Sequence, residues 1–353
     1  MDKNSKIYIA GHTGLIGSAI FKKLQNEGYE NIICKTHSEL DLLNQQAVRE
    51  FFEKEKPEYV FFCAAKVGGM LAQLKQRAEF LYDNLTMQNN VIYNSYLQGV
   101  KKLLYLGSIC VYPEKANLPI KEDDLFEGKL QYNNEPYAIA KIAGLKMCEF
   151  YSLQYGVDYI SILPVSVYGS NDNFDINTAH VQAAIFRKIY LAKLLNEKKY
   201  ENLKSDLGVK TKEEALKDLT KINIDENSVK LLGTGNSKRE FLHCDDLAEA
   251  SVFIMNNISF KDTISNEQQK TNSHINIGTG YDISIKELAF MIKDILDYKG
   301  NIYFENLKEN DGTIRKVVDT TKMKSLGWSY KIDLKDGLTK MYHDYLEKRR
   351  KKQ

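Results

Sequence analysis

The chain has 353 residues, of which 43% are hydrophobic and 27% are charged, which is enough material for one large domain or two lobes. Its formal net charge of +2 gives no general attraction to nucleic acid or to a membrane, and no apolar stretch is long enough to span a bilayer. The five cysteines (Cys34, Cys63, Cys110, Cys148 and Cys244) form no CxxC pair, and the first residues lack a secretory signal. We therefore expect a cytoplasmic protein with reduced thiols and no metal site.

Short apolar runs alternate with helical patterns in the first half of the chain. The runs occupy residues 6–11, 31–35, 59–65, 102–108 and 159–167, and amphipathic stretches such as 18–28 and 46–56 lie between them. Continuous apolar strands separated by helices are typical of a parallel sheet that is covered on both faces. Because crossovers are right-handed, we predict an α/β, doubly wound parallel sheet of the Rossmann type in residues 1–166.

The loop behind the first run, "IAGHTGLIG", places Gly11, Gly14 and Gly17 between a strand and a helix. The first glycine permits a tight turn, the second lets the backbone approach a pyrophosphate, and the third lets helix and strand pack closely. Unpaired N–H groups at the helix N-terminus would hold the anion. The position of the loop favours a dinucleotide site over a glycine-rich turn that binds nothing.

The second run ends in "CKTH", with Lys35 and His37 where NAD-binding sheets usually place an acidic residue for the ribose hydroxyls. A cation at this point suits a 2′-phosphate, so the sequence favours NADP (NADPH when reduced). The alternative is that Lys35 is only a solvated strand end.

The fourth run ends in "LGSICVYP", so Ser108 stands at the carboxyl end of a parallel strand, where doubly wound sheets bind ligands. Further on, "NEPYAIAK" sets Tyr137 and Lys141 four residues apart on one helix face. Carbonyl reduction needs a proton donor, and an adjacent ammonium together with the cationic nicotinamide would lower the phenol pKa from about 10. We predict that Tyr137 supplies the proton, Lys141 assists it and Ser108 hydrogen-bonds the carbonyl.

The remaining chain, residues 167–353, is predicted to form mainly a smaller C-terminal substrate-binding lobe that is interleaved with the sheet. Residues 191–229 are charged and helical in pattern, which indicates an insertion with its own helices. Strands and helices from about 240–280 are expected to return to the sheet. Residues 284–300 have the pattern of a helix that ends at glycine.

Several segments together resemble the extended short-chain dehydrogenase/reductase family, whose members act on nucleotide sugars. Within it, the chain is most similar to the GDP-L-fucose synthase branch, the GDP-4-keto-6-deoxymannose 3,5-epimerase/4-reductases. The similar segments cover nearly the whole chain apart from residues 191–229. They are "IAGHTGLIGSAI", "AAKVGG" (64–69), "NEPYAIAKIAG", "DNF" (172–174), "REFLH" (239–243) and "DGTIRK" (311–316).

This resemblance implies roles for individual residues. Ser108, Tyr137 and Lys141 match the reductive triad, and Cys110 and His180 match the epimerisation pair. A thiol and an imidazole are suitable acid and base for carbons that flank a 4-keto group. The implied substrate contacts are Lys188, Leu232, Arg239 and Asp311. The implied cofactor contacts are Gly11, His12, Thr13, Gly14, Leu15, Ile16, Gly17, Lys35, His37, Asp41, Leu42, Ala64, Ala65, Lys66, Tyr137, Lys141, Pro164, Val165, Ser166, Val167 and His180.

The chain departs from the family pattern around the sugar pocket. Family members commonly carry arginine at the positions of Thr13 and His37, a serine at Ile109, an asparagine at Ser166 and an aromatic residue at Leu232. None of these changes touches the reductive triad.

We therefore expect NADPH-dependent reduction of the 4-keto group of a GDP-4-keto-6-deoxy sugar, with 3,5-epimerisation. One alternative is a reductase without epimerase activity that acts on a related GDP-4-keto sugar, such as a heptose for surface polysaccharide. A distant alternative is a non-catalytic nucleotide-sensing protein. The resemblance also implies a homodimer.

Overall fold

The computed structural model describes residues 1–176, 178–264, 272–307 and 311–350. The chain divides into two compact units, each built from segments that are far apart in the sequence. Unit 1 comprises Met1–Val167, Phe241–Gly280 and Val317–Lys331. Unit 2 comprises Tyr168–Glu240, Tyr281–Lys316 and Ile332–Gln353, of which the last three residues are not described.

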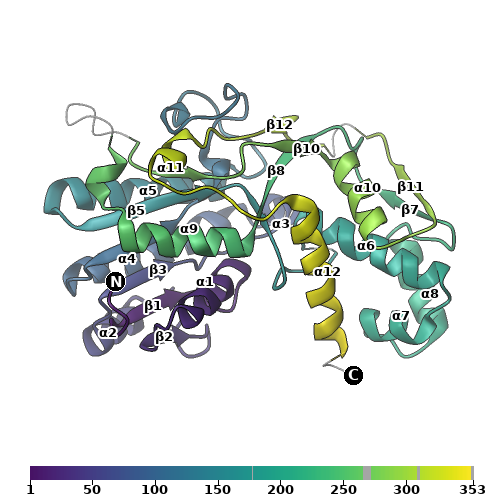
Figure 1. The fold of residues 1–353 in the computed structure, drawn as a ribbon, viewed down its shortest axis with the longest axis horizontal. Helices are drawn as coiled ribbons and strands as arrows, with labels where there is room; N and C mark the ends of the chain where they lie inside the picture. Colours follow the sequence, from purple (N-terminus) through teal and green to yellow (C-terminus); the bar gives the residue numbers. More distant parts are fainter. Residues whose placement is uncertain (177, 265–271, 308–310, 351–353) are drawn as a thin grey trace. The chain divides into compact units, whose positions relative to one another are not determined.

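Unit 1 is built on a six-stranded sheet with the order β2-β1-β3-β4-β5-β9 (Figure 1). All its neighbouring pairs are parallel, and Ile7 of β1 lies opposite Ile32 of β2 and Tyr59 of β3. The predicted doubly wound α/β fold is therefore confirmed. The strands are β1 Ile7–Ala10, β2 Ile32–Lys35, β3 Tyr59–Phe62, β4 Lys102–Leu106, β5 Asp158–Pro164 and β9 Ile275–Ile277.

The helices of unit 1 form two groups, because the strand order reverses between β1 and β3 and crossovers are right-handed. In one group α1 packs against α9; in the other, α4 packs against α2 and α5. All residues of β1 and β4 are buried, as expected for a sheet covered on both faces. The elements are α1 Leu15–Asn26, α2 Gln45–Glu55, α3 Met70–Lys75, α4 Arg77–Leu97, α5 Glu135–Tyr155, α9 Cys244–Asn257, α11 Thr321–Ser325 and the 3₁₀ turns η1 Ile109–Val111, η2 Glu122–Asp124 and η3 Phe260–Thr263.

Unit 2 is mainly helical, with α10 packed against α6 and α12. The helical pattern of residues 191–229 is present as the end of α6 and as α7 and α8. The helices are α6 Val181–Asn196, α7 Tyr200–Leu207, α8 Lys212–Lys221, α10 Ile285–Ile295 and α12 Leu334–Arg350. The strands are β7 Ser228–Leu231, β10 Asp282–Ser284, β11 Asn301–Phe304 and β12 Arg315–Lys316, while β6 Ser166–Tyr168 and β8 Lys238–His243 lie where the chain passes between the units.

Helix α10 ends earlier than the sequence pattern predicts. Its last residue is Ile295, and Asp297 takes the left-handed conformation with a φ of 52°. The Tyr298 N–H then returns to the Lys293 carbonyl, so the chain leaves the helix without glycine. The predicted glycine stop at residue 300 is therefore wrong, because an aspartate tolerates the left-handed position that glycine usually fills.

Among the described residues, none of the helices combines the length and apolar character needed to cross a membrane.

Candidate active site

The glycine loop lies at the point of the sheet where the strand order reverses, which is where doubly wound sheets bind ligands. Gly11 has a φ of +87°, and a Cβ on it would lie 2.7 Å from the Ala64 backbone nitrogen. A Cβ on Gly17 would collide with the Gly11 carbonyl oxygen. Both glycines are therefore required by the protein's own packing of β1, β3 and α1.

Gly14 is different, because a Cβ there would meet only the Gly11 oxygen at an ordinary 3.5 Å. It is exposed and forms the N-cap of α1, where no side chain caps the helix. Packing within the protein does not require glycine at this position. A pyrophosphate bound at the helix N-terminus would require it, because a side chain would keep the phosphate away from the backbone N–H groups. The Nδ1 atom of His12 is buried without a hydrogen-bond partner among the described residues. An open helix end beside an unsatisfied imidazole fits an anionic dinucleotide.

The predicted 2′-phosphate residues, Lys35 and His37, lie at and just after the end of β2, each next to an acidic side chain. The Nζ atom of Lys35 lies 3.9 Å from Glu39 Oε1, and His37 Nδ1 lies 3.7 Å from Asp41 Oδ1. Glu39 also accepts hydrogen bonds from the N–H and hydroxyl of Thr36 at 2.8 and 2.7 Å. These contacts lower the pKa of Glu39, so its carboxylate stays ionised beside the lysine.

The segment after β3 is held from the neighbouring helix α4. The side chain of Asn84 accepts a hydrogen bond from the Lys66 N–H at 3.0 Å and donates to the Lys66 carbonyl at 3.1 Å. The Lys66 Nζ atom donates to Asp83 at 2.8 Å. Ala64 and Ala65 are half-buried just before this clamp. Leu42 is buried, and its carbonyl accepts from Asn90 at 2.8 Å.

Other predicted cofactor contacts lie near the same edge of the sheet. Thr13 is exposed, and Leu15 and Ile16 pack against the core beside it. Pro164 ends β5, and the Val165 N–H donates to the Ile277 carbonyl of β9 at 3.0 Å. Ser166 and Val167 are half-buried and begin β6.

The predicted catalytic residues of unit 1 lie close together behind β4 and on α5. Ser108 is the N-cap of η1, and its Oγ atom accepts from the Cys110 N–H at 3.3 Å. The turn η1 packs against α5, and the Cys110 thiol acts electrostatically on both Tyr137 and Lys141 of that helix. Pro136 stands in the first turn of α5, where its missing N–H costs nothing.

The Lys141 ammonium is hydrogen-bonded to the end of β4 and lies over the ring of Tyr137. Its Nζ atom donates to the Leu106 carbonyl at 2.8 Å and lies 5.8 Å from the centroid of the Tyr137 ring. Burial lowers the pKa of Lys141 to about 8, a change that the nearby thiols of Cys110, Cys63 and Cys148 oppose. The amine is therefore mainly charged at neutral pH and can lose its proton in mild alkali.

Burial raises the pKa of Tyr137, and the nearby Cys110 acts in the same direction. In the protein alone, loss of hydration outweighs the attraction of the Lys141 ammonium, and the lowering expected beside a cationic nicotinamide stays a prediction for the protein with its cofactor. The ring also meets the edge of Phe80, with centroids 6.4 Å apart. The phenol is thus kept protonated, which is the form that donates a proton.

In unit 2, three predicted substrate residues surround one loop. Both carboxylate oxygens of Asp311 accept from Thr234, from its N–H at 2.7 Å and its hydroxyl at 2.6 Å. The Arg239 guanidinium donates to the carbonyls of Lys238 at 2.7 Å and Asp311 at 3.4 Å. Leu232, two residues before Thr234, is 62% exposed.

Lys188 lies within α6, and His180 precedes the first residue of that helix. The Lys188 Nζ atom donates to the Lys230 carbonyl of β7 at 2.8 Å, and burial lowers its pKa to about 8. His180 is the N-cap of α6 and is partly open to solvent, and the desolvation by its surroundings lowers its pKa as well. A neutral imidazole at neutral pH can accept a proton.

Comparison with known proteins extends this picture. The model of the NAD dependent epimerase/dehydratase family matches residues 7–278. The chain belongs to the NAD-dependent epimerase/dehydratase family. It is 44% identical to a putative GDP-L-fucose synthase 2 of Arabidopsis thaliana, over 98% of this chain and 93% of that protein. These matches confirm the predicted family and the prediction of a nucleotide-dependent oxidoreductase.

Two solved structures from Campylobacter jejuni are also similar to this chain. One is a GDP-6-OMe-4-keto-L-xylo-heptose reductase, with 47% identity, a TM-score of 0.95 and coverage of 99% of both chains. The other is a GDP-D-glycero-L-gluco-heptose synthase in the presence of NADPH, with 47% identity, a TM-score of 0.93 and coverage of 98% of this chain and 99% of that one. The NADPH in this similar structure, together with the family match, supports the use of an NAD(P) cofactor by the chain described here.

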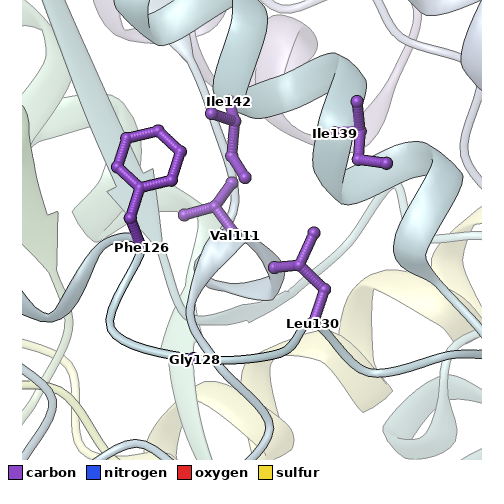
Figure 2. A pocket seen from close by; sticks show the side chains of 6 residues that line it. All are labelled: Val111, Phe126, Gly128, Leu130, Ile139 and Ile142. Carbon is purple, nitrogen blue, oxygen red and sulfur yellow. The ribbon is translucent and has the colours of Figure 1, made fainter.

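An apolar pocket of about 280 Å³ lies beside the catalytic segment (Figure 2). Val111 follows Cys110, and Ile142 follows Lys141, so the pocket lies on a different face of these elements from the chemistry. Its lining offers neither charge nor a side-chain hydrogen-bonding group, so it cannot itself perform proton transfer. The lining residues are Val111, Phe126, Gly128, Leu130, Ile139 and Ile142.

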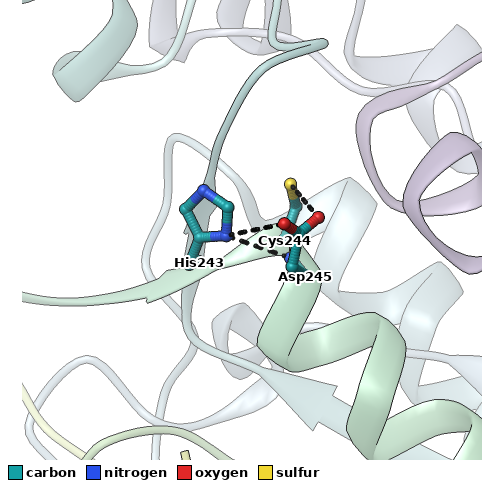
Figure 3. Close-up of side chains that lie close together, drawn as sticks. All are labelled: His243, Cys244 and Asp245. Carbon is teal, nitrogen blue, oxygen red and sulfur yellow. Dashed lines mark hydrogen bonds and ion pairs between the residues drawn. The ribbon is translucent and has the colours of Figure 1, made fainter. Parts of the chain in front are cut away.

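One group among the described residues has the composition of a metal site, at the start of α9 (Figure 3). The ligand atoms of His243, Cys244 and Asp245 lie within 4.8 Å of one another. The Nδ1 atom of His243, however, accepts from the Asp245 N–H at 3.2 Å and caps the helix. A cation would compete for that lone pair and face the positive end of the helix dipole, so the geometry favours a cap.

The sequence analysis missed three residues of the candidate active site. Asn84 clamps Lys66, Phe80 packs on Tyr137, and Glu39 stands beside Lys35. The sequence shows Asn84 and Gln88 one helical turn apart, but their burial, which marks them as important, appears only in the structure. No local signal marks Phe80, whose role depends on the packing of α4 against α5.

Proposed function

We propose that the protein uses NADPH to reduce the 4-keto group of a GDP-4-keto-6-deoxy sugar, and that it also epimerises C3 and C5. The observation that carries this proposal is that η1, with Ser108 and Cys110, packs against α5, with Tyr137 and Lys141, at the carboxyl edge of the sheet that also carries the glycine loop. Solved relatives of similar length are described as GDP-sugar reductases, which supports the same chemistry.

NADPH supplies the hydride when it is bound. Tyr137 then gives its proton to the oxygen of the reduced carbonyl, and its raised pKa keeps that proton available until charge develops. Ser108 is positioned to donate a hydrogen bond to the same oxygen. The Lys141 ammonium stabilises the phenolate that remains, and the Leu106 carbonyl fixes its position.

The glycine loop and the open N-terminus of α1 would hold the pyrophosphate of the cofactor. Lys35 and His37 would meet the 2′-phosphate, while Asp41, Leu42, Ala64, Ala65, Lys66 and residues 164–167 would line the rest of the cofactor site. In unit 2, Arg239 and Lys188 are suited to the GDP phosphates, because burial has already removed much of their hydration.

Epimerisation requires a base and an acid for the two carbons that flank the ketone. Partial desolvation lowers the pKa of His180, which favours the neutral imidazole that can remove a proton. The Cys110 thiol lies beside Tyr137 and can return one. We assign this pair to the exchange at C3 and C5.

A second function has its own support. Leu232 is small and exposed where the family carries an aromatic residue, which leaves room for a longer sugar. Two similar solved structures are described as heptose enzymes. The alternative is a reductase without epimerase activity that acts on a GDP-4-keto-heptose of a surface-polysaccharide pathway.

Incubation in deuterated water separates these functions. With GDP-4-keto-6-deoxymannose and NADPH, the first function predicts deuterium at C3 and C5 of the product by NMR, and a Cys110→Ser variant should lose it. Reduction of an epimerised ketone without any exchange supports the alternative. Tyr137→Phe tests for a nucleotide-sensing protein: if wild type and variant bind NADPH equally and neither turns over any GDP-4-keto sugar, both enzymatic proposals fail.

We also propose that the protein is a homodimer formed through α4 and α5. These helices pack side by side, and their outer surface carries exposed apolar side chains. Burying that surface against a second copy would be favourable. The residues are Tyr82, Tyr93, Leu97, Ile139, Phe150, Leu153 and Tyr155.

A further inference from the structure

Tyr112 is a fully buried tyrosine that directly follows the catalytic turn η1. Its exposed fraction is 0%, and it lies two residues after Cys110. Its hydroxyl donates to Asn276 Oδ1 at 2.6 Å and lies 3.0 Å from His274 Nε2. Both partners belong to the segment of β9, so the hydroxyl ties η1 to a strand that comes more than 160 residues later.

The direction of these hydrogen bonds can be worked out. The Asn276 Nδ2 atom donates to the Ile120 carbonyl at 3.1 Å, which fixes the amide so that Oδ1 faces Tyr112. The single phenol proton goes to that oxygen, so His274 must donate from Nε2. Burial lowers the pKa of His274 well below its ordinary value, which agrees with a neutral ring. The tyrosine hydroxyl is thus fully satisfied.

The anchor is itself held in place. The Asn276 N–H donates to Glu122 of η2 at 3.0 Å. The Lys322 ammonium donates to the carbonyls of Asn272, Ser273 and His274 at 3.1, 3.3 and 2.8 Å. The strand end that receives Tyr112 is therefore a fixed point, against which a short turn can be positioned.

The turn η1 needs such an anchor, because it has only three residues. Within it, the Tyr112 N–H returns to Ile109 and the Cys110 N–H to Ser108 Oγ, both at 3.3 Å. These bonds are long and local, so they set the shape of the turn but not its distance from α5. The Tyr112 phenol supplies the long-range constraint.

We propose that Tyr112 is a positioning residue that holds Ser108 and Cys110 in register with Tyr137. This inference rests on the proposed function for its effect on turnover, but not for its effect on the Cys110 thiol. Loss of the hydroxyl would let η1 shift by a fraction of an ångström while the ring still fills the core. A displacement near 1 Å at a reacting group can cost about 100-fold in rate.

The test compares Tyr112→Phe with Tyr159→Phe. Tyr159 is 1% exposed, and its buried hydroxyl has no hydrogen-bond partner among the described residues, so it is a matched control on β5. We expect Tyr112→Phe to lower kcat about 10- to 100-fold. We expect KM for NADPH to stay within about 2-fold, because the glycine loop is separate from the anchor. Tyr159→Phe should leave both constants unchanged.

A second measurement does not depend on the substrate. Cys110 is 8% exposed, so iodoacetamide should label it slowly in the wild type, as followed by mass spectrometry of its peptide. A loosened η1 should speed labelling several-fold in Tyr112→Phe and not in Tyr159→Phe. If no GDP-4-keto sugar is turned over by the wild type, the proposed function fails, and the labelling rates still decide this inference. Equal labelling of all three proteins, or an unchanged kcat in Tyr112→Phe, would overturn it.

Discussion

At the scale of single residues, Lys141 links activity to pH. Its folded pKa of about 8 lies below the ordinary value of 10.5. The ammonium that stabilises the Tyr137 phenolate is therefore lost as pH rises through about 8, so kcat/KM for reduction should fall there. A flat kcat/KM profile to pH 9.5 would remove Lys141 from the mechanism.

Stability should move in the opposite direction over this range. Between the folded and unfolded pKa values the unfolded chain binds more protons, so the free energy of unfolding contributed by Lys141 rises from pH 8 toward 10.5. Lys188 and Lys322, whose pKa values burial also lowers to about 8, act with the same sign. Urea titrations alongside the kinetics therefore separate loss of the charged amine from unfolding.

Lys35 offers a test of cofactor choice. Replacing it by methionine keeps the length of the side chain and removes the charge proposed to meet the 2′-phosphate. We expect the ratio of kcat/KM for NADPH to that for NADH to fall about 10-fold, since a charged hydrogen bond contributes about 1.5–3 kcal/mol. The control is Lys23→Met, which removes a lysine paired with Glu27 on α1. If both variants give the same ratio as the wild type, Lys35 does not read the cofactor.

The sequence predicted the identity of these residues better than their electrostatics. Tyr137 and Lys141 were found from a spacing and a chemical need, and both are on α5 as expected. Their pKa shifts could not be found this way, because desolvation depends on residues such as Phe80 that come from other elements. The acid beside Lys35 was missed for a simpler reason, since a turn brings Glu39 back to the strand end.

At the scale of elements, the close approach of α5 to β4 and α4 depends on one helical glycine. A Cβ on Gly144 would lie 2.6 Å from Gln88 Oε1 and would clash with the Tyr105 hydroxyl, which donates to that oxygen at 2.8 Å. Helix propensity alone predicts that Gly144→Ala stabilises by about 1 kcal/mol. We expect destabilisation by about 1–3 kcal/mol instead, from overpacking.

Urea unfolding of the wild type and Gly144→Ala decides between these signs. A Gly144→Ala, Tyr105→Phe double variant removes the contact with the Tyr105 hydroxyl but keeps the ring carbon Cζ, 2.5 Å from the added Cβ, so only part of the lost stability should return. A gain of stability in the single variant would mean that α5 can move away from β4 without cost.

Element boundaries were predictable where a local pattern sets them. The strands β1 to β5 follow apolar runs, and α1 follows the glycine loop. The end of α10 was not predictable in this way. Asp297 adopts the left-handed conformation just after the helix, and aspartate has only a weak preference for that conformation.

At the scale of the whole molecule, the apolar surface of α4 and α5 predicts association. Phe150 is 57% exposed on this surface, and burying such a ring contributes about 2 kcal/mol, which is roughly 30-fold in the dissociation constant. Phe150→Glu should therefore shift the protein toward monomer in sedimentation velocity. Tyr303→Glu, at an exposed position on β11, should not. A monomeric wild type at micromolar concentration would contradict the proposed dimer.

The interleaving of the two units has a consequence for synthesis on the ribosome. Residues 241–280 and 317–331 complete unit 1, and residues 281–316 and 332–353 belong to unit 2. The nascent chain therefore cannot complete unit 1 before Lys331 has emerged from the ribosome. It also cannot add α12 to unit 2 before residues 334–350 have been synthesised. Premature stop codons even in the last helix should leave chains that chaperones retain, and neither unit can be transplanted as one continuous cassette.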